Sequence, residues 1–337
     1  MDSLTHIALG ACIAEVFFDK KIGKKALLWG ALAQSLPDID FVAGLWMPVS
    51  QELLAHRGFT HSLLFLVLLT PLLSLLARRI HPEMQVPLKK WILFFGLEML
   101  VHIFLDGFNN YGIGWLEPFS HQRFSFNTIY VADPFFSIWP GIAAFVLLVI
   151  PLFSPKRKFW WRFGIWLPFF YLAYCVVNKL KIDHDVKQVF AAQHIPSARY
   201  FTTPAPLNNW LWFVVSGDDR GYYIGFRSMF DKDPKMVFSF FPRNDSLLTP
   251  IADHKDLQNL VRFSRQFYTV EKWGDSLVFN DLRFGQIIGW HDPKEKFVFH
   301  YILQHPKDNN LVVQRGRFAK WDESVAISLW QRMWGIK

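Results

Sequence analysis

The sequence predicts an α-helical, polytopic membrane domain followed by a soluble β-rich (α+β) domain. Of its 337 residues, 52% are hydrophobic and 18% aromatic, including 35 Phe and 15 Trp. The mean hydropathy is nevertheless only +0.16, because residues 1–180 hold 26 charged side chains and residues 181–337 hold 38. We therefore predict a membrane-embedded domain over residues 1–180 and an extracytoplasmic β-rich domain over residues 183–337. This composition excludes intrinsic disorder, and two cysteines exclude a disulfide scaffold.

Six apolar segments in the first part predict about six helices. A bilayer-spanning helix needs roughly 20 residues, so the first two segments are marginal in length for a full crossing. The segments are Leu4–Phe18, Ala26–Pro37, Ser62–Ala77, Trp91–Leu105, Pro134–Pro155 and Phe159–Asn178.

Positive charge in the first domain gathers in three clusters between these segments. The clusters are Lys20/Lys21/Lys24/Lys25, Arg78/Arg79/Lys89/Lys90 and Lys156/Arg157/Lys158/Arg162. The positive-inside rule places such short basic loops in the cytoplasm. The extracytoplasmic side then holds the amino terminus, the 38–61 and 106–133 loops and everything after Lys179. The net charge of +8 thus indicates orientation, and the lack of a basic stripe alternating with aromatics argues against a nucleic-acid partner.

The second part predicts strands, because short alternating or aromatic runs are separated by turn signals such as Gly217-Asp218-Asp219. Two short helices are expected near Asp253–Phe263 and Glu323–Trp334. The predicted strands are Trp210–Ser216, Tyr222–Arg227, Val237–Phe241, Gln266–Lys272, Leu277–Phe279, Phe297–Gln304 and Leu311–Gln314.

Histidine and aspartate residues at the ends of the apolar segments form the candidate site. Ionisable residues in such segments are costly and are therefore functional candidates. His102 and Asp106, four residues apart, share one helix face. Imidazole and carboxylate ligands suit Zn²⁺ first, with Mn²⁺ or Fe as alternatives, and their number predicts two ions. The candidates, all on the predicted extracytoplasmic face, are His6, Asp38, Asp40, His56, His61, His102, Asp106 and Asp133.

Three residues near these ligands have predicted catalytic roles. Asp40 or Asp133 is the expected general base if it is not fully committed to metal. Arg57, between His56 and His61, is a candidate anion clamp, with a helix cap or a lipid-headgroup contact as the alternative. Glu98 lies one turn further along the His102 face and is expected to have an outer or a structural role.

Together these motifs resemble the bacterial membrane-bound metal-dependent hydrolase family, whose members include LexA-regulated inner-membrane proteins. That family is in turn similar to the all-helical zinc-dependent phospholipases C. The resemblance implies a phospholipase-C-like metal core, phosphoester hydrolysis, and the ligands His6, Asp38, His56, His61, His102 and Asp106, followed by Asp40 and Asp133. The motifs are Thr5-His6, Pro37-Asp38-Ile39-Asp40, His56-Arg57-Gly58-Phe59-Thr60-His61-Ser62, His102-x-x-Leu105-Asp106, Tyr111-Gly112, Pro118-Phe119-Ser120 and Asp133-Pro134.

The sequence thus predicts a multi-pass hydrolase of the bacterial inner membrane, with its site and second domain on the extracytoplasmic side. Its expected partners are the bilayer and an amphipathic or phosphoester substrate. The metal would lower the pKa of a bound water to about 7. One alternative is an ion or metal transporter, which predicts ligands spread through the membrane depth. The other is a non-catalytic protein with a structural metal and a periplasmic binding module.

Overall fold

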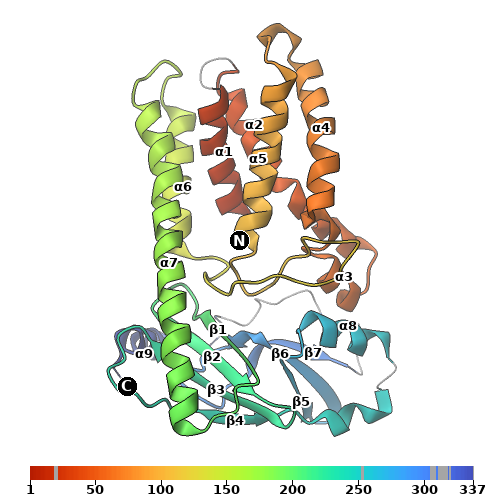
Figure 1. Cartoon of the computed structure of the whole chain (residues 1–337), viewed down its shortest axis with the longest axis vertical. Coiled ribbons are helices and arrows are strands. Elements are labelled where there is room, and N and C mark those ends of the chain that lie inside the picture. The colour runs from red at the N-terminus through yellow and green to blue at the C-terminus, as the bar shows by residue number, and fades with distance from the viewer. Residues whose placement is uncertain (19–21, 252–253, 304–308, 310–317, 319, 337) are drawn as a thin grey trace. The chain divides into compact units, whose positions relative to one another are not determined.

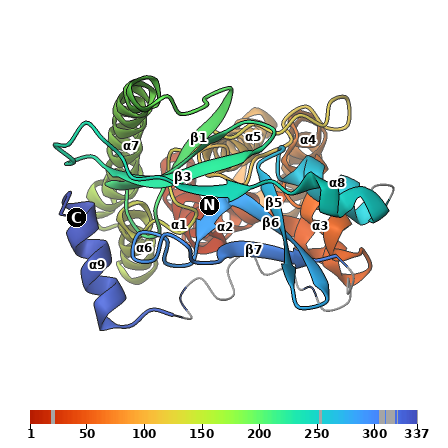
Figure 2. The ribbon, with the colours of Figure 1, turned by 90° about the horizontal axis from the view of Figure 1, so that it is seen from below.

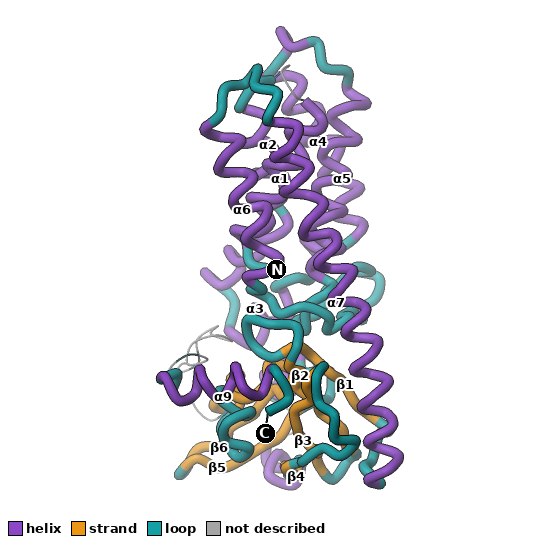
Figure 3. Tube along the Cα trace, turned by 90° about the vertical axis from the view of Figure 1, so that its left-hand side faces the viewer, coloured by secondary structure: helices purple, strands orange, loops and turns teal. Residues whose placement is uncertain are grey.

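The computed structural model describes residues 1–18, 22–251, 254–303, 309, 318 and 320–336. The chain divides into two compact units, Met1–Val42 with Ala55–Cys175, and Ala43–Leu54 with Val176–Lys337. Figure 3 shows that the first is helical and that strands occur in the second. The predicted order of a helical part and a β-rich part is therefore confirmed.

Each predicted apolar segment contains a helix of the first unit. In Figure 1, these helices run alongside one another, together with the first part of α7. α7 is longer than predicted, so the predicted domain boundary near residue 180 falls inside it. The helices are α1 (Ser3–Phe18), α2 (Lys25–Ser35), α4 (Leu63–Ile80), α5 (Leu88–Asp106), α6 (Pro134–Val149) and α7 (Arg157–Gln193), with short 3₁₀ helices η1 (Pro37–Leu45), η2 (Phe59–His61) and η3 (Pro82–Met84).

Within the described residues, two helices have the length and composition of a membrane span. These are α4 and α7, whereas α1 and α6 are apolar but shorter. Crossing by all six helices therefore stays a prediction.

Close packing of α1 on α2 depends on two glycines. A Cβ atom on Gly10 would overlap the carbonyl oxygen of Gly30, and one on Gly30 would overlap that of Gly10. The two backbones can therefore touch at this crossing. His6 and Gln34 each lie one helical turn from the crossing, and this close approach brings their side chains together.

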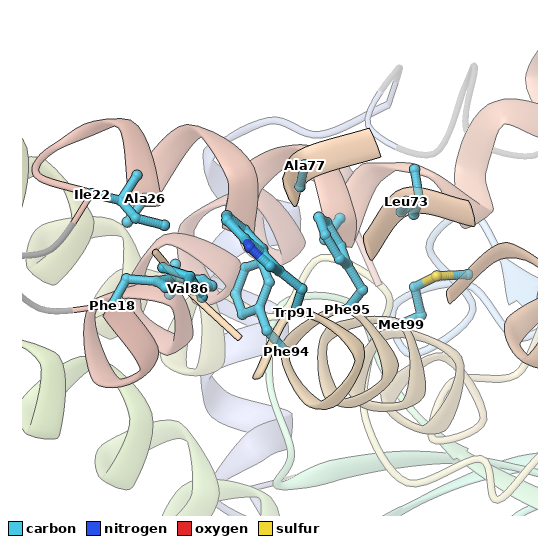
Figure 4. Packing of buried hydrophobic residues seen from close by; sticks show 12 residues of the cluster. Phe18, Ile22, Ala26, Leu73, Ala77, Val86, Trp91, Phe94, Phe95 and Met99 are labelled. Atoms are coloured by element: carbon cyan, nitrogen blue, oxygen red, sulfur yellow. The ribbon is translucent and has the colours of Figure 1, made fainter. Parts of the chain in front are cut away.

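An aromatic core fixes the rotation of α5. Trp91, Phe94, Phe95 and Met99 are fully buried in one cluster with residues of α1 and α4, and Figure 4 shows their side chains packed together. Met99 lies three residues before His102 on the buried face of this helix. The packing that anchors α5 therefore also turns His102 into the bundle.

The second unit contains two antiparallel sheets, seen in Figure 2. Strand β1 was not predicted, and the predicted strand Leu311–Gln314 lies outside the described residues. Predicted strands correspond to the other six. The first sheet has the order β1 (Arg199–Pro204), β2 (Leu211–Gly217), β3 (Gly221–Ser228), β4 (Ser239–Pro242), and the second β5 (Tyr268–Trp273), β6 (Ser276–Gln286), β7 (Phe297–Ile302). This unit also holds α3 (Val49–Ala55), η4 (Asp245–Ile251), α8 (Lys255–Phe263) and α9 (Glu323–Met333).

β2 is buried along its whole length because both of its faces are covered. On one face Trp212 and Val214 pack against Ile182 and Val186 from the second half of α7. On the other face, Phe213 and Val215 belong to a cluster that includes Leu282 and Phe297 of the second sheet. A strand covered on both sides reads as a continuous apolar run rather than as an alternation.

Candidate metal centre

Four predicted ligands meet in the first unit. Asp38 comes from η1, His61 from η2, and His102 and Asp106 from the last two turns of α5. One ligand atom from each lies within 4.8 Å of the others. Three of the four side chains are fully buried, and only Asp38 keeps 17% of its side chain exposed. Residues far apart in the chain therefore form one compact cluster.

The spacing of these atoms suits a single tetrahedral ion. His61 Nε2 lies 3.2 Å from His102 Nε2, 3.5 Å from Asp38 Oδ1 and 3.5 Å from Asp106 Oδ2. The distances from His102 Nε2 to the same carboxylate oxygens are 3.6 and 3.8 Å. Atoms bound to one Zn²⁺ at about 2.0–2.1 Å in a tetrahedron lie about 3.3 Å apart. The cluster needs little rearrangement to hold such an ion.

The contacts of His61 fix which of its nitrogens faces the cluster. Its Nδ1 lies 3.2 Å from Asp40 Oδ2 and 3.1 Å from the Thr60 hydroxyl oxygen, and it can donate its hydrogen to either oxygen. The unprotonated Nε2 then points toward the other ligands. A carboxylate that holds a metal-binding histidine in this way is a common outer partner of metal sites. Asp40 thus has the position of an outer contact.

His102 and Asp106 both carry polar atoms that lack hydrogen-bond partners among the described residues. These are His102 Nδ1 and Asp106 Oδ2. Asp106 Oδ2 nevertheless lies 2.9 Å from Arg57 Nε, which gives it an ion pair. Buried polar atoms without hydrogen bonds are costly. A carboxylate oxygen has a second lone pair, so the Arg57 contact leaves Asp106 Oδ2 able to coordinate an ion at this position.

His6 is held beside the cluster by a chain of buried polar groups. Gln34 Nε2 donates to the backbone oxygen and to Oε2 of Glu98, at 2.8 and 2.9 Å. Its Oε1 therefore accepts from His6 Nδ1, 3.1 Å away. The unprotonated His6 Nε2 then faces Asp106 Oδ1 at 3.2 Å, so two acceptors point at each other. The backbone nitrogen of Met1 lies against the same oxygen.

The side-chain charges of the centre do not balance. Three carboxylates, Asp38, Asp40 and Asp106, surround one guanidinium, that of Arg57. Burial alone would raise the pKa of Asp38, but its contacts with His102 and His61 outweigh burial and hold that pKa well below its usual value. Contacts with His56 and His61 do the same for the pKa of Asp40. Three carboxylates beside one guanidinium leave an excess of negative side-chain charge, which a divalent cation would offset.

His56 lies outside the four-residue cluster. Its Nδ1 donates to Asp40 Oδ1 at 2.9 Å, and its ring packs edge-on against Tyr111 at 4.9 Å. Asp40 also accepts from the backbone nitrogen of Arg57 and from the Thr60 hydroxyl. Both oxygens of Asp40 are thus engaged within this loop. Direct metal binding by His56 or Asp40 stays a prediction.

Arg57 reaches into the centre rather than into an open substrate cleft. Besides the Asp106 contact, its Nη1 donates to Asn109 Oδ1 at 2.8 Å and its Nη2 to the Met1 carbonyl at 3.2 Å. All three nitrogens are engaged, and the residue has a positive φ of 58°. These contacts favour a role in positioning Asp106.

Asp133 caps α6. It accepts from the backbone nitrogens of Phe135 and Phe136 and from the Tyr171 hydroxyl at 2.9 Å. Burial raises the pKa of this carboxyl to about 6, against the opposing effect of these hydrogen bonds. In the described part of the chain, no hydrogen bond or ion pair joins Asp133 to the four-residue cluster. Its predicted catalytic role therefore has no support from these contacts.

Two residues of the centre were not among the predicted candidates. Gln34 orients His6, and Asn109 accepts from Arg57. Gln34 is a polar residue within the apolar run of α2. Its position was therefore a signal, but a search for ionisable residues does not detect a neutral amide. Asn109 lies just past the end of α5 and shows no such signal.

The basic residues lie at the opposite end of the helical bundle. Lys24 Nζ donates to the Leu148 carbonyl at 2.5 Å, which joins the start of α2 to the end of α6. Arg157, at the start of α7, pairs with Glu15 near the end of α1. Figure 1 shows the loops between α4 and α5 and between α6 and α7 at this end, away from the amino terminus. The separation of basic and ligand residues thus matches the sequence pattern, while orientation in the membrane stays a prediction.

Comparison with known families shows where the chain belongs. Residues 1–182 match the model of the family described as "YdjM inner membrane protein". The chain belongs to this family. Its membership supports an inner-membrane location, and the predicted resemblance is confirmed at this level. The further similarity to hydrolases and phospholipases C stays a prediction.

Two relatives extend the comparison. Inner membrane protein YbcI of Escherichia coli (strain K12) is 32% identical over 123 residues, which cover 36% of this chain and 69% of the relative. A protein named YfhP from Bacillus subtilis (strain 168) is 29% identical over 171 residues, which cover 44% of this chain and 51% of that relative. The chain thus spans about half the length of the latter. No solved structure matches.

Proposed function

We propose that the protein is a membrane-bound metal-dependent hydrolase that cleaves a phosphoester or lipid-like substrate at the extracytoplasmic face of the inner membrane. The observation that carries the proposal is the buried cluster of Asp38, His61, His102 and Asp106. Its distances and its excess of negative side-chain charge both fit a divalent cation.

These four residues would hold the metal, with Zn²⁺ as the first candidate. Two nitrogen and two oxygen ligands are within the range that Zn²⁺ accepts. When bound, such an ion supplies Lewis-acid chemistry, activating water at neutral pH and polarising a phosphoryl or acyl oxygen. We propose that His6, whose Nε2 faces Asp106 Oδ1, would be a ligand of the expected second ion.

The remaining residues of the centre position its ligands. Asp40 orients His61, and Gln34 orients His6. Arg57 holds Asp106 through Nε and is itself held by Asn109. A rigid set of outer contacts of this kind keeps catalytic groups in their productive geometry. Because both oxygens of Asp40 are engaged, we propose that its contribution is orientation rather than proton transfer.

Exposed apolar side chains that are close in sequence to the cluster, or in a loop bonded to it, favour an amphipathic substrate. Ile39 and Phe41 alternate with the two aspartates of η1 and are exposed. Leu4 is also exposed and follows Ser3, whose hydroxyl donates to Asp38. Phe119, which is 84% exposed, lies in a loop joined to the ligand loop by the hydrogen bond from Gly114 N to the Arg57 carbonyl. Such side chains suit the headgroup level of a membrane.

The proposal is tested with the full chain in lipid nanodiscs. Bound metal is measured by elemental analysis, and hydrolysis is screened on phosphomonoesters, phosphodiesters and glycerolipids. His61→Ala should lose both metal and hydrolysis. His81→Ala is the matched control, because His81 is also buried but bonds to Trp29 at the other end of the bundle.

Equal metal content in wild type and His61→Ala would contradict a metal centre at this cluster. Metal that is lost in His61→Ala, with no substrate hydrolysed by wild type, would instead favour a structural metal. Metal flux into proteoliposomes that depends on His61 would favour the transporter.

A further inference from the structure

The second unit contains a cavity whose lining includes none of the residues of the metal centre. It has a volume of about 310 Å³ and is bounded by β3, the segment before β4, the loop after β6, and α9. Ligand pockets for small molecules begin at about 300 Å³. The cavity is therefore large enough for part of a small ligand, and its walls come entirely from the second unit.

The walls of this cavity are mostly apolar. Phe226, Met236 and Trp290 line it, and Val237 and Ile336 also line it while remaining largely exposed. Apolar side chains that are exposed at a cavity favour a ligand with a hydrocarbon chain. The apolar lining thus continues from the interior to the surface.

The polar groups of the cavity favour an anionic head. Lys235 and His291 line it, and none of the described lining residues is acidic. Arg332 also lines it, but its charge is paired with Asp231 at 2.7 Å. Positive side chains in a lining without a described acidic residue favour an anionic group over a neutral one.

We propose that this cavity binds a single-chain amphiphile with an anionic head, its chain lying against Phe226 and Met236 and its head near Lys235. Two sources share this chemistry, a fatty-acid carboxylate and an alkyl phosphate. The site does not depend on the metal centre or on hydrolysis, so the two proposals fail separately.

The test is photolabelling of the full chain in nanodiscs with a dodecanoate that carries a diazirine. Peptides covering residues 286–293 and 328–336 should be labelled, and their labelling is normalised to that of α4, which reports general exposure to the probe. Excess dodecanoate or dodecyl phosphate should compete with the probe and reduce this labelling. The compound that reduces it more strongly identifies the preferred head group. Dodecanol should not compete.

Two variants and a control sharpen the test. We define specific labelling as the part of the labelling that excess dodecanoate removes. Lys235→Glu should lower specific labelling by about tenfold, which is the effect of losing one charge-assisted hydrogen bond. Ser328→Trp should abolish specific labelling by filling the cavity, which Ser328 lines. Lys232→Glu is the matched control, because Lys232 does not line this cavity, and it should label as wild type does. Equal competition by dodecanol, or undiminished labelling in Ser328→Trp, would overturn the proposal.

Discussion

The two ends of the helical bundle bury charge in opposite ways. At the basic end, Glu15 and Arg157 form a buried pair in which Arg157 Nε and Nη2 each donate at 2.6 Å to a different carboxylate oxygen. Arg157 Nη1 donates to the Leu147 and Ile150 carbonyls. At the other end, three carboxylates share one guanidinium, and Asp106 Oδ2 lacks a hydrogen bond among the described residues.

This contrast separates structural from functional burial of charge. A buried pair costs little when both partners are satisfied, and it then joins two segments of the chain. A cluster with unbalanced charge is unfavourable by itself and persists where a ligand completes it. We therefore interpret the buried pair at the basic end as structural and the cluster at the other end as a candidate site.

Removing a ligand should produce the largest difference between the two ends. In Asp106→Asn, bound metal should fall to near zero, and hydrolysis should fall by more than the roughly 10–100-fold typical of outer contacts. The variant also loses the buried ion pair with Arg57, so its stability is not the diagnostic quantity. Elemental analysis and turnover measure the effects, with circular dichroism to check that the variant is folded. Unchanged metal content in folded Asp106→Asn would show that Asp106 is not a ligand.

Breaking the pair at the basic end should have the reverse effect. Arg157→Met leaves Glu15 buried without its partner, and the free energy of unfolding should fall by about 3–5 kcal/mol. Metal content should stay unchanged. Combining it with Glu15→Gln should restore part of the stability, since the unpaired charge is then removed. Loss of metal in correctly folded Arg157→Met would mean that the two ends are coupled.

The ligand set was accessible from sequence because it leaves a strong signal. The four residues of the cluster are ionisable and lie at the ends of apolar segments: Asp38, His61, His102 and Asp106. The basic clusters in the other loops then predicted that all four lie at the same face of the membrane. Their contacts were less accessible. That Arg57 reaches Asp106 depends on how a loop folds over the end of α5, and no spacing in the sequence encodes that distance.

The fold shows the same limit. The six apolar runs predicted the helices, but α7 continues to Gln193 through a segment rich in charge. Ile182, Val186, Val189 and Phe190 recur at helical spacing there and are buried, so a periodicity signal existed that the charged residues obscured. β1, in contrast, is a short strand whose last residue is Pro204. Its Tyr200, Phe201, Thr202 and Thr203 are nevertheless typical strand residues, so here too the sequence held a signal that the prediction missed.

Asp133 tests whether a carboxylate at the ligand end can be purely structural. Its folded pKa of about 6 lies above the ordinary value of 3.8, so the folded state holds its proton more tightly than the unfolded state. Stability should therefore fall as pH rises from about 4 to 6, by up to roughly 3 kcal/mol. Asp133→Asn keeps a capping side chain and should remove this pH dependence without loss of metal. An unchanged pH profile in Asp133→Asn would assign the dependence to another group.

The smallest effect is expected for the outer contact of His61. Asp40→Asn weakens the hydrogen bonds that orient His61 and His56, because a neutral amide replaces a carboxylate, while the four ligands remain. Metal affinity should fall by about 10–100-fold, with binding still measurable by competition against a chelator. Asp133→Asn serves as the matched control, since it changes a buried carboxylate at the same end that does not touch a ligand. Complete loss of metal in folded Asp40→Asn would make Asp40 a direct ligand, and unchanged affinity would show that His61 is oriented by Thr60 instead.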